Sequence, residues 1–228
     1  MKGSELDAFR ASDHYRTWIS SEEACLLILS GHNDQSILYG TDQCWLSPVA
    51  IAAVNDLSRQ KSRNVYSYYT FPRDRQLIYG VLPIILLQLL RQKSHALRDG
   101  GRYDELCAEL HKFREYRQLD EPAEKQRDDM VSTIEKAALR VIDFFEQSEV
   151  VYIIIDRADR CWSSSRIDHR YLFLKTLVKM VEAARSKLRV LVIIDGSSWQ
   201  VQKHRDELGE NTNGRVIIHT AHQGESGP

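Results

Sequence analysis

Residues 150–161 read Val-Val-Tyr-Ile-Ile-Ile-Asp-Arg-Ala-Asp-Arg-Cys, and this stretch decides the fold. Six apolar residues in a row, without alternation, predict a strand that is buried on both faces, as in the centre of a parallel sheet. Asp156 follows directly, and open α/β sheets bind their ligands at the carboxyl ends of their strands. The stretch therefore predicts an α/β domain with candidate site residues at Asp156 and Asp159.

Four further apolar or β-branched segments alternate with helical patterns, which indicates parallel pairing through right-handed crossovers. The chain has 228 residues, a length that suits one such domain. We expect an N-terminal helix at 5–20, a core at 24–220 and a frayed tail at 221–228. The other strands are expected at 25–30, 65–71, 188–194 and 215–220, and later helices are expected to begin at Ser47, near Leu82 and near Ser165.

Composition limits the classes of function. Lys and Arg total 31 against 32 acidic residues, a formal net charge of −1, which disfavours a nucleic-acid-binding domain. The longest apolar segment, 81–90, is shorter than the roughly 20 residues of a membrane helix, and the polar N-terminus carries no signal peptide. The four cysteines are widely spaced without a C-x-x-C pair, so we expect buried thiols and no metal site. These features predict a protein inside the cell, cytoplasmic or nuclear, without membrane contact.

The candidate phosphate-binding loop departs from the pattern that nucleotide hydrolysis needs. P-loop NTPases combine a strand-end Asp with the motif G-x-x-x-x-G-K-[ST] after an earlier strand. After residues 26–30 this chain reads Gly-His-Asn-Asp-Gln-Ser-Ile-Leu. Counting from Gly31 places Ser36, Ile37 and Leu38 at the Gly, Lys and Ser/Thr positions. Half of the nucleotide site is therefore predicted to be missing.

Several strings occur in an order that resembles the NTPase domain of STAND proteins, the NACHT-type class common in fungi. They are Trp-Ile-Ser at 18–20, Leu-Leu-Ile-Leu-Ser-Gly at 26–31, Ile-Leu-Leu-Gln-Leu-Leu at 85–90 and the stretch at 153–161. The resemblance covers about residues 14–220. It implies a three-layer, P-loop NTPase-like domain with a five-stranded, mostly parallel sheet in the order 5-1-4-3-2. Arg160 departs from the family pattern, which has an acid at this position.

From these departures we expect a pseudo-NTPase with no cofactor, which acts as a protein–protein interaction module or regulatory scaffold. Its partner would be another protein. The sequence identifies neither that partner nor the oligomeric state of this chain. Asp156 and Asp159 would then be vestigial. Two roles stay open for Ile37, Leu38, Tyr39 and Trp45 in the loop at 31–46. They could anchor a protein partner at the surface, or fold back and fill the vacated nucleotide pocket.

The alternative is a STAND switch that still binds Mg-ATP or Mg-GTP and hydrolyses it weakly. Its phosphate loop would be rebuilt from Gly31, Asn33, Ser36, Gly40 and Thr41, with Asp156 holding the magnesium ion. In that case the protein would be an NTP hydrolase.

Overall fold

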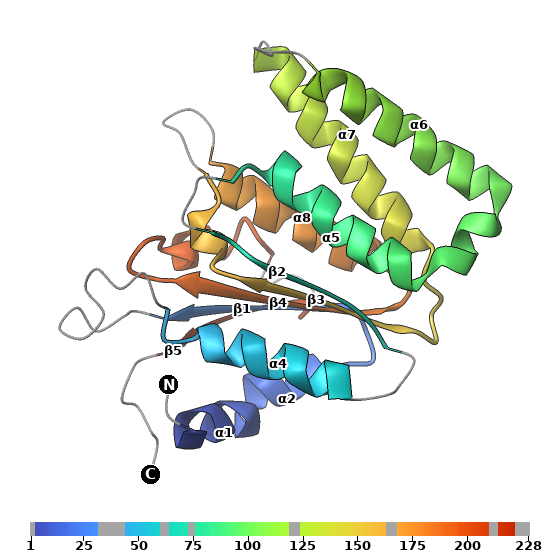
Figure 1. The fold of residues 1–228 in the computed structure, drawn as a ribbon. Coiled ribbons are helices and arrows are strands. Elements are labelled where there is room, and N and C mark those ends of the chain that lie inside the picture. The colour runs from blue at the N-terminus through green and yellow to red at the C-terminus, as the bar shows by residue number, and fades with distance from the viewer. Residues whose placement is uncertain are drawn as a thin grey trace.

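Five parallel strands form the central sheet of the protein (Figure 1). The computed structural model describes residues 3–31, 44–59, 64–72, 76–118, 124–162, 168–209 and 214–221. The strands lie in the order β2-β3-β4-β1-β5, which is the expected 5-1-4-3-2 read from the other edge. Every pair is parallel, so the sheet is all-parallel rather than mostly parallel. The strands are β1 (Cys25–Gly31), β2 (Val65–Thr70), β3 (Val150–Asp156), β4 (Lys187–Asp195) and β5 (Val216–Ala221).

Helices cover both faces of the sheet and make the fold three layers deep (Figure 1). On one face lie α1 (Gly3–Ala11), α2 (Asp13–Ser20) and α4 (Ser47–Arg59). On the other lie α5 (Ile78–Gln92), α7 (Glu124–Asp143) and α8 (His169–Ala183), with α6 (Gly100–Arg117) packed on α7 further out. Three 3-10 helices complete the described elements, at Ser94–Arg98, Ala158–Arg160 and Val201–His204.

Two hydrophobic cores result, one on each face, and the strands supply alternate residues to them. In β3, Val151, Ile153 and Ile155 belong to the core under α5, α7 and α8. Tyr152 and Ile154 belong to the core under α2 and α4. Burying one such aliphatic side chain contributes about 1.5–3 kcal/mol. The unbroken apolar run at 150–155 is therefore explained by two buried faces, as the sequence predicted.

Helix boundaries differ from the sequence prediction at several places. The single helix expected at 5–20 is two helices, because Ser12 caps α2 and its Oγ accepts a hydrogen bond from the Tyr15 N–H at 3.4 Å. Helix α5 begins at Ile78, ahead of Leu82, and contains Pro83. Helix α8 begins at His169 rather than near Ser165, because the Asp168 side chain caps its first N–H groups.

The N-terminal helices are fixed to the sheet by one buried arginine. Arg189 of β4 is 3% exposed and donates hydrogen bonds to the carbonyls of Ile19, Ser21 and Glu23. These carbonyls lie at and just after the end of α2, where a helix leaves its acceptors without partners. A single guanidinium therefore holds the chain where it passes from α2 to β1.

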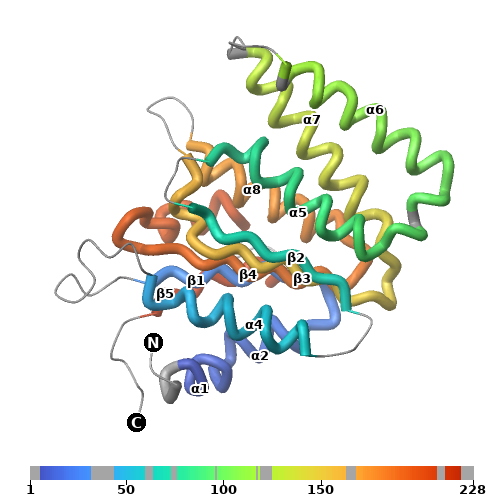
Figure 2. Tube along the Cα trace, viewed as in Figure 1, coloured from blue at the N-terminus to red at the C-terminus, as the bar shows by residue number. Residues whose placement is uncertain are grey.

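Helices α6 and α7 form an antiparallel pair that extends away from the sheet (Figure 2). Leu106 and Phe113 of α6 are buried in the large core, while Tyr103 is 43% exposed. None of the helices in the described part of the chain is both long and apolar enough to cross a bilayer.

Candidate functional site

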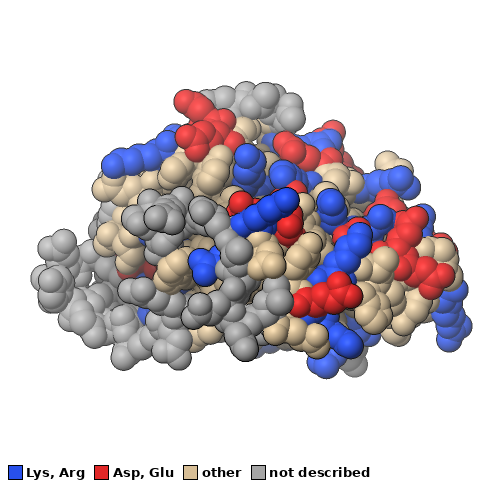
Figure 3. Space-filling view, turned by 90° about the horizontal axis from the view of Figure 1, so that it is seen from above, with Lys and Arg blue, Asp and Glu red and all other residues tan. Residues whose placement is uncertain are grey.

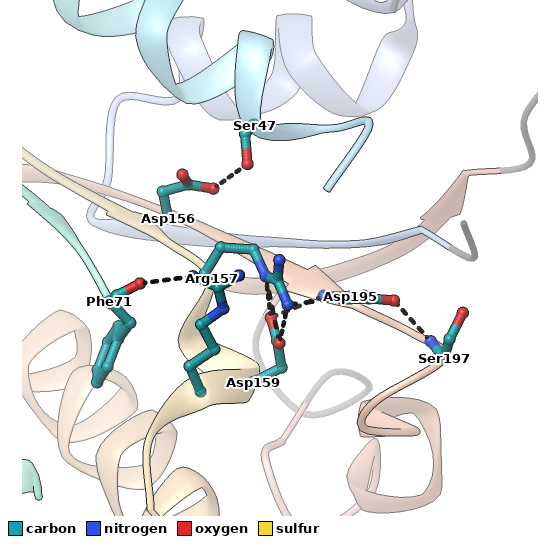
Figure 4. A network of polar contacts seen from close by, with 8 residues as sticks. Ser47, Phe71, Asp156, Arg157, Asp159, Asp195 and Ser197 are labelled. Carbon is teal, nitrogen blue, oxygen red and sulfur yellow. Dashed lines mark hydrogen bonds and ion pairs between the residues drawn. The ribbon is translucent and has the colours of Figure 1, made fainter. Parts of the chain in front are cut away.

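The candidate site lies at the carboxyl edge of the sheet and begins with a contact between β3 and α4. Asp156, the last residue of β3, is 4% exposed. Ser47, the first residue of α4, donates a hydrogen bond from its Oγ to Asp156 Oδ1 at 2.8 Å (Figure 4). Burial raises the pKa of the Asp156 carboxyl, and the Ser47 hydrogen bond offsets part of that rise. Two residues that are 109 positions apart are thus joined at the strand end.

This contact offers a second alignment of the phosphate loop, beside the one counted from Gly31. In P-loop proteins a Ser/Thr hydroxyl at the start of the helix after the first strand, together with a strand-end Asp, holds a magnesium ion. Ser47 and Asp156 occupy comparable places, at the start of the helix after β1 and at the end of β3. Ser47 follows Gly31 by sixteen positions, whereas the Ser/Thr of the motif follows its first Gly by seven, and Leu38 lies outside the described residues.

The two residues before Ser47 fill the space beside Gly31. Leu46 is fully buried, and Trp45 is 7% exposed. A Cβ atom on Gly31 would come within 2.5 Å of Leu46 Cδ1 and 2.8 Å of Trp45 Nε1, so only glycine fits there. Of the two roles left open for Trp45, this burial favours filling of the pocket over a surface anchor. Leu46 directly precedes Ser47, as the Lys of the motif directly precedes its Ser/Thr.

The other loop residues named from the sequence lie outside the described part of the chain. They are Asn33, Ser36, Ile37, Leu38, Tyr39, Gly40 and Thr41. Cys44, just after them, is buried beneath the site, and this burial raises the pKa of its thiol to about 12. A thiol with such a pKa stays protonated and unreactive at neutral pH.

Arg157 occupies an unusual backbone conformation directly after Asp156. Its φ of 64° and ψ of 44° lie in the left-handed region, and it is the only non-glycine residue with positive φ among those described. This conformation costs about 1–2 kcal/mol for a residue with a side chain. It turns the Arg157 guanidinium back over the sheet edge, between Asp159 and Asp195 (Figure 4).

The second candidate acid, Asp159, is held in an ion pair with Arg157. Arg157 Nε and Nη2 donate to its carboxylate at 3.1 and 2.8 Å, and Nη2 lies 3.6 Å from Asp195 Oδ2. Asp159 Oδ1 also accepts the Asp195 N–H at 2.9 Å. Burial alone would lower the pKa of Arg157, but Asp159 raises it, so the guanidinium stays charged. Both oxygens of Asp159 are therefore in use within the protein.

Arg157 and Asp195 were missed as site residues by the sequence reasoning. The sequence shows that Asp195 follows an apolar strand, which marks it as a strand-end acid. It gives no indication of the left-handed turn that brings Arg157 to Asp195. Arg160, which replaces an expected acid, donates from Nη1 to the Phe71 carbonyl at 3.3 Å. The structure thus brings Gly31, Trp45, Asp156 and Asp159 to one edge of the sheet.

Of the protein groups that could hold a metal, Ser47 and Asp156 fit best. Magnesium takes oxygen ligands and is usually bound by one or two carboxylates together with water and phosphate. The described residues contain no group of three His, Cys, Asp or Glu side chains suited to a metal ion. Any magnesium here would take most of its ligands from water and phosphate oxygens.

The fold and the site define an α/β domain with a five-stranded all-parallel sheet, consistent with a P-loop-like fold. Residues 6–193 match the family described as Nephrocystin 3, N-terminal, and the chain belongs to this family. The family is an N-terminal module of NACHT-type proteins, in line with the resemblance drawn from the sequence. The match includes Ser47, Asp156 and Asp159 and ends before Asp195. No curated protein matches the chain.

Proposed function

We propose that this domain is a pseudo-NTPase that keeps the nucleotide-binding architecture, does not hydrolyse nucleotide and acts through a protein partner. The observation that carries the proposal is the packing of Leu46 and Trp45 against Gly31, directly before Ser47. In an active phosphate loop, a Lys at the position of Leu46 lies along the β- and γ-phosphates. A buried leucine cannot supply that charge.

The charges around the site support the same proposal. Without the Lys, and in the absence of a magnesium ion between them, phosphate oxygens and an ionised Asp156 carboxylate would face each other directly. Two like unit charges at about 4 Å and an effective dielectric near 20 repel by roughly 4 kcal/mol, which is about a thousandfold in affinity. The nearby Arg157 is paired with Asp159 and Asp195 and would have to leave both carboxylates to compensate.

Asp159 is also poorly suited to catalysis. A general base must accept a proton from the attacking water. The ion pair with Arg157 and the hydrogen bond from the Asp195 N–H occupy both oxygens of Asp159. A water molecule could be oriented by Asp159 only after the ion pair had opened.

The protein-binding part of the proposal rests on the family, which supplies N-terminal modules to NACHT-type proteins. Lys and Arg side chains are intermixed with Asp and Glu on the face in Figure 3, without a region of one sign. Such a face offers little attraction for a nucleic-acid backbone. We therefore propose a protein as the partner.

Titration with Mg-ATP and Mg-GTP tests the proposal, with calorimetry, thermal melting and phosphate release as readouts. Ligand at 100 times its dissociation constant adds about 2.7 kcal/mol of stability, which in a chain of this size is a melting shift of roughly 5–11 °C. We expect no such shift at millimolar nucleotide and no phosphate release above background. A shift of several degrees that Asp156→Asn removes would contradict the pseudo-NTPase proposal.

The Ser47–Asp156 hydrogen bond favours a second candidate, a switch that binds Mg-nucleotide weakly. The pair keeps the oxygen atoms that would hold magnesium, at a hydrogen-bond distance of 2.8 Å. In this case a melting shift should require magnesium and should be lost in both Ser47→Ala and Asp156→Asn. A shift that persists without magnesium would contradict this candidate.

A further inference from the structure

Strand β2 lies at one edge of the sheet, and no other strand among the described residues pairs with its outer side. An open edge presents backbone N–H and C=O groups that can pair with a strand from another molecule. The outward groups of β2 include those of Tyr66 and Tyr68, whose N–H and C=O bond to side chains rather than to β3.

Two glutamines of α5 cover these groups. Gln88 accepts the Tyr68 N–H at 2.9 Å through Oε1 and donates through Nε2 to the Tyr68 carbonyl at 3.1 Å. Gln92 accepts the Tyr66 N–H at 3.2 Å and donates to the Tyr66 carbonyl in the same way. Each side-chain amide thus makes the pair of hydrogen bonds that a residue of an adjacent strand would make.

The spacing of the glutamines matches the spacing of the strand. Residues four apart on a helix lie on the same face and are separated by about 6.0 Å along the axis. Residues two apart on a strand are separated by about 6.6 Å. Gln88 and Gln92 are therefore in register with Tyr68 and Tyr66, and one turn of helix covers two residues of the edge.

We propose that Gln88 and Gln92 close the β2 edge against strand addition, and that the edge without them pairs with β2 of a second copy of this chain. A twofold axis brings the β2 edges of two copies together in antiparallel order. In this arrangement the outward N–H and C=O groups of one β2 face those of the other, so the edge is complementary to itself. Ile84 and Leu87 on α5 are 43% and 49% exposed and add apolar surface near the edge. The glutamines belong to the same chain as β2, so their hydrogen bonds to Tyr66 and Tyr68 are intramolecular. An incoming strand must compete with these bonds, which re-form whenever the strand dissociates.

The test compares Gln88→Ala/Gln92→Ala with the wild type by analytical ultracentrifugation over a hundredfold range of concentration. We expect the double variant to reach at least twice the wild-type mass at high concentration, with an unchanged far-UV spectrum. Arg91→Ala is the matched control, because Arg91 is exposed on the same helix between the two glutamines. This control should keep the wild-type mass throughout.

Hydrogen exchange locates the new contact. At low concentration the Tyr66 and Tyr68 amides of the double variant should exchange at least tenfold faster than in the wild type. At high concentration they should be protected again. A folded double variant that keeps the wild-type mass at every concentration would overturn the proposal, and so would association that leaves these amides unprotected.

If the double variant does not fold, Gln92→Ala alone provides the same test, because it uncovers only Tyr66 and leaves the Gln88 bonds in place. We expect a smaller, concentration-dependent gain in mass for this variant. A mass equal to that of the wild type, together with a faster-exchanging Tyr66 amide, would show that an uncovered edge does not associate and would overturn the proposal.

Discussion

Replacement of Arg157 by Ala should be among the most damaging single changes in this protein. The Arg157 and Asp159 side chains are 7% and 1% exposed, and the Asp195 side chain is 9% exposed. Arg157→Ala leaves two buried carboxylates without their shared cation. Loss of one partner of a buried ion pair typically costs about 3–5 kcal/mol. For a chain of this length that corresponds to a fall of roughly 6–20 °C in melting temperature.

A matched variant separates charge from backbone strain. Arg157→Gly removes the same charge, but glycine adopts a φ of 64° without the steric cost that alanine keeps. We therefore expect Arg157→Gly to be about 1 kcal/mol more stable than Arg157→Ala, although both are less stable than the wild type. Urea unfolding followed by circular dichroism measures both differences.

Two results would refute this reasoning. A loss of less than about 1 kcal/mol in Arg157→Ala would mean that the ion pair is far more hydrated than its burial indicates. Equal stability of the alanine and glycine variants would mean that residue 157 is not held in the left-handed conformation in solution.

Three further predictions follow from the described contacts. Burial raises the pKa of Asp156 above its ordinary value of 3.8. As pH rises above 3.8, the unfolded chain loses the Asp156 proton while the folded protein still holds it. The contribution of Asp156 to the free energy of unfolding therefore falls as pH rises above 3.8. Asp156→Asn should therefore gain stability relative to the wild type between pH 4 and pH 7 in urea unfolding, and a constant difference would contradict the shift. Trp45→Ala should lower the free energy of unfolding by about 3–5 kcal/mol if Trp45 fills the pocket. A near-normal melting temperature would instead support a role for Trp45 as a surface anchor for a partner. Arg189→Ala should lose about 1.5–3 kcal/mol because the carbonyls of Ile19, Ser21 and Glu23 lose hydrogen bonds from a charged donor, and proteolysis should then cut first near residue 21.

The strands and their parallel pairing could be predicted from signals that the sequence carries strongly, whereas the strand order was implied only by the resemblance to P-loop NTPases. Long apolar runs such as 150–155 and 188–194 mark strands buried on both faces, and the helical patterns between them require parallel crossovers. The helix start at Ser47 was also predicted, because proline is favoured in the first turn. These are local patterns, and each of them agrees with the fold.

The site was harder to predict because its contacts join distant parts of the chain. The phosphate-loop alignment used the fixed spacing of the motif, whereas the contact at the end of β3 joins Ser47 and Asp156, which are 109 positions apart. The left-handed turn at Arg157 has no residue signal, because glycine or asparagine would be expected there. Gln88 stood in the sequence only as one polar residue within an apolar string, and its bonds to β2 depend on how α5 lies against the sheet.

The place of β1 in the sheet has a consequence for how the protein is made. This strand is fully buried between β4 and β5, both of which come from the last part of the chain. More than 150 residues must be added after Gly31 before the first of these neighbours begins at Lys187. At roughly 5–20 residues per second, the ribosome needs about 8–30 s for that length. Throughout this interval a strand whose seven residues are all buried in the folded domain is without its partners, so the nascent chain should depend on chaperones that bind extended apolar segments.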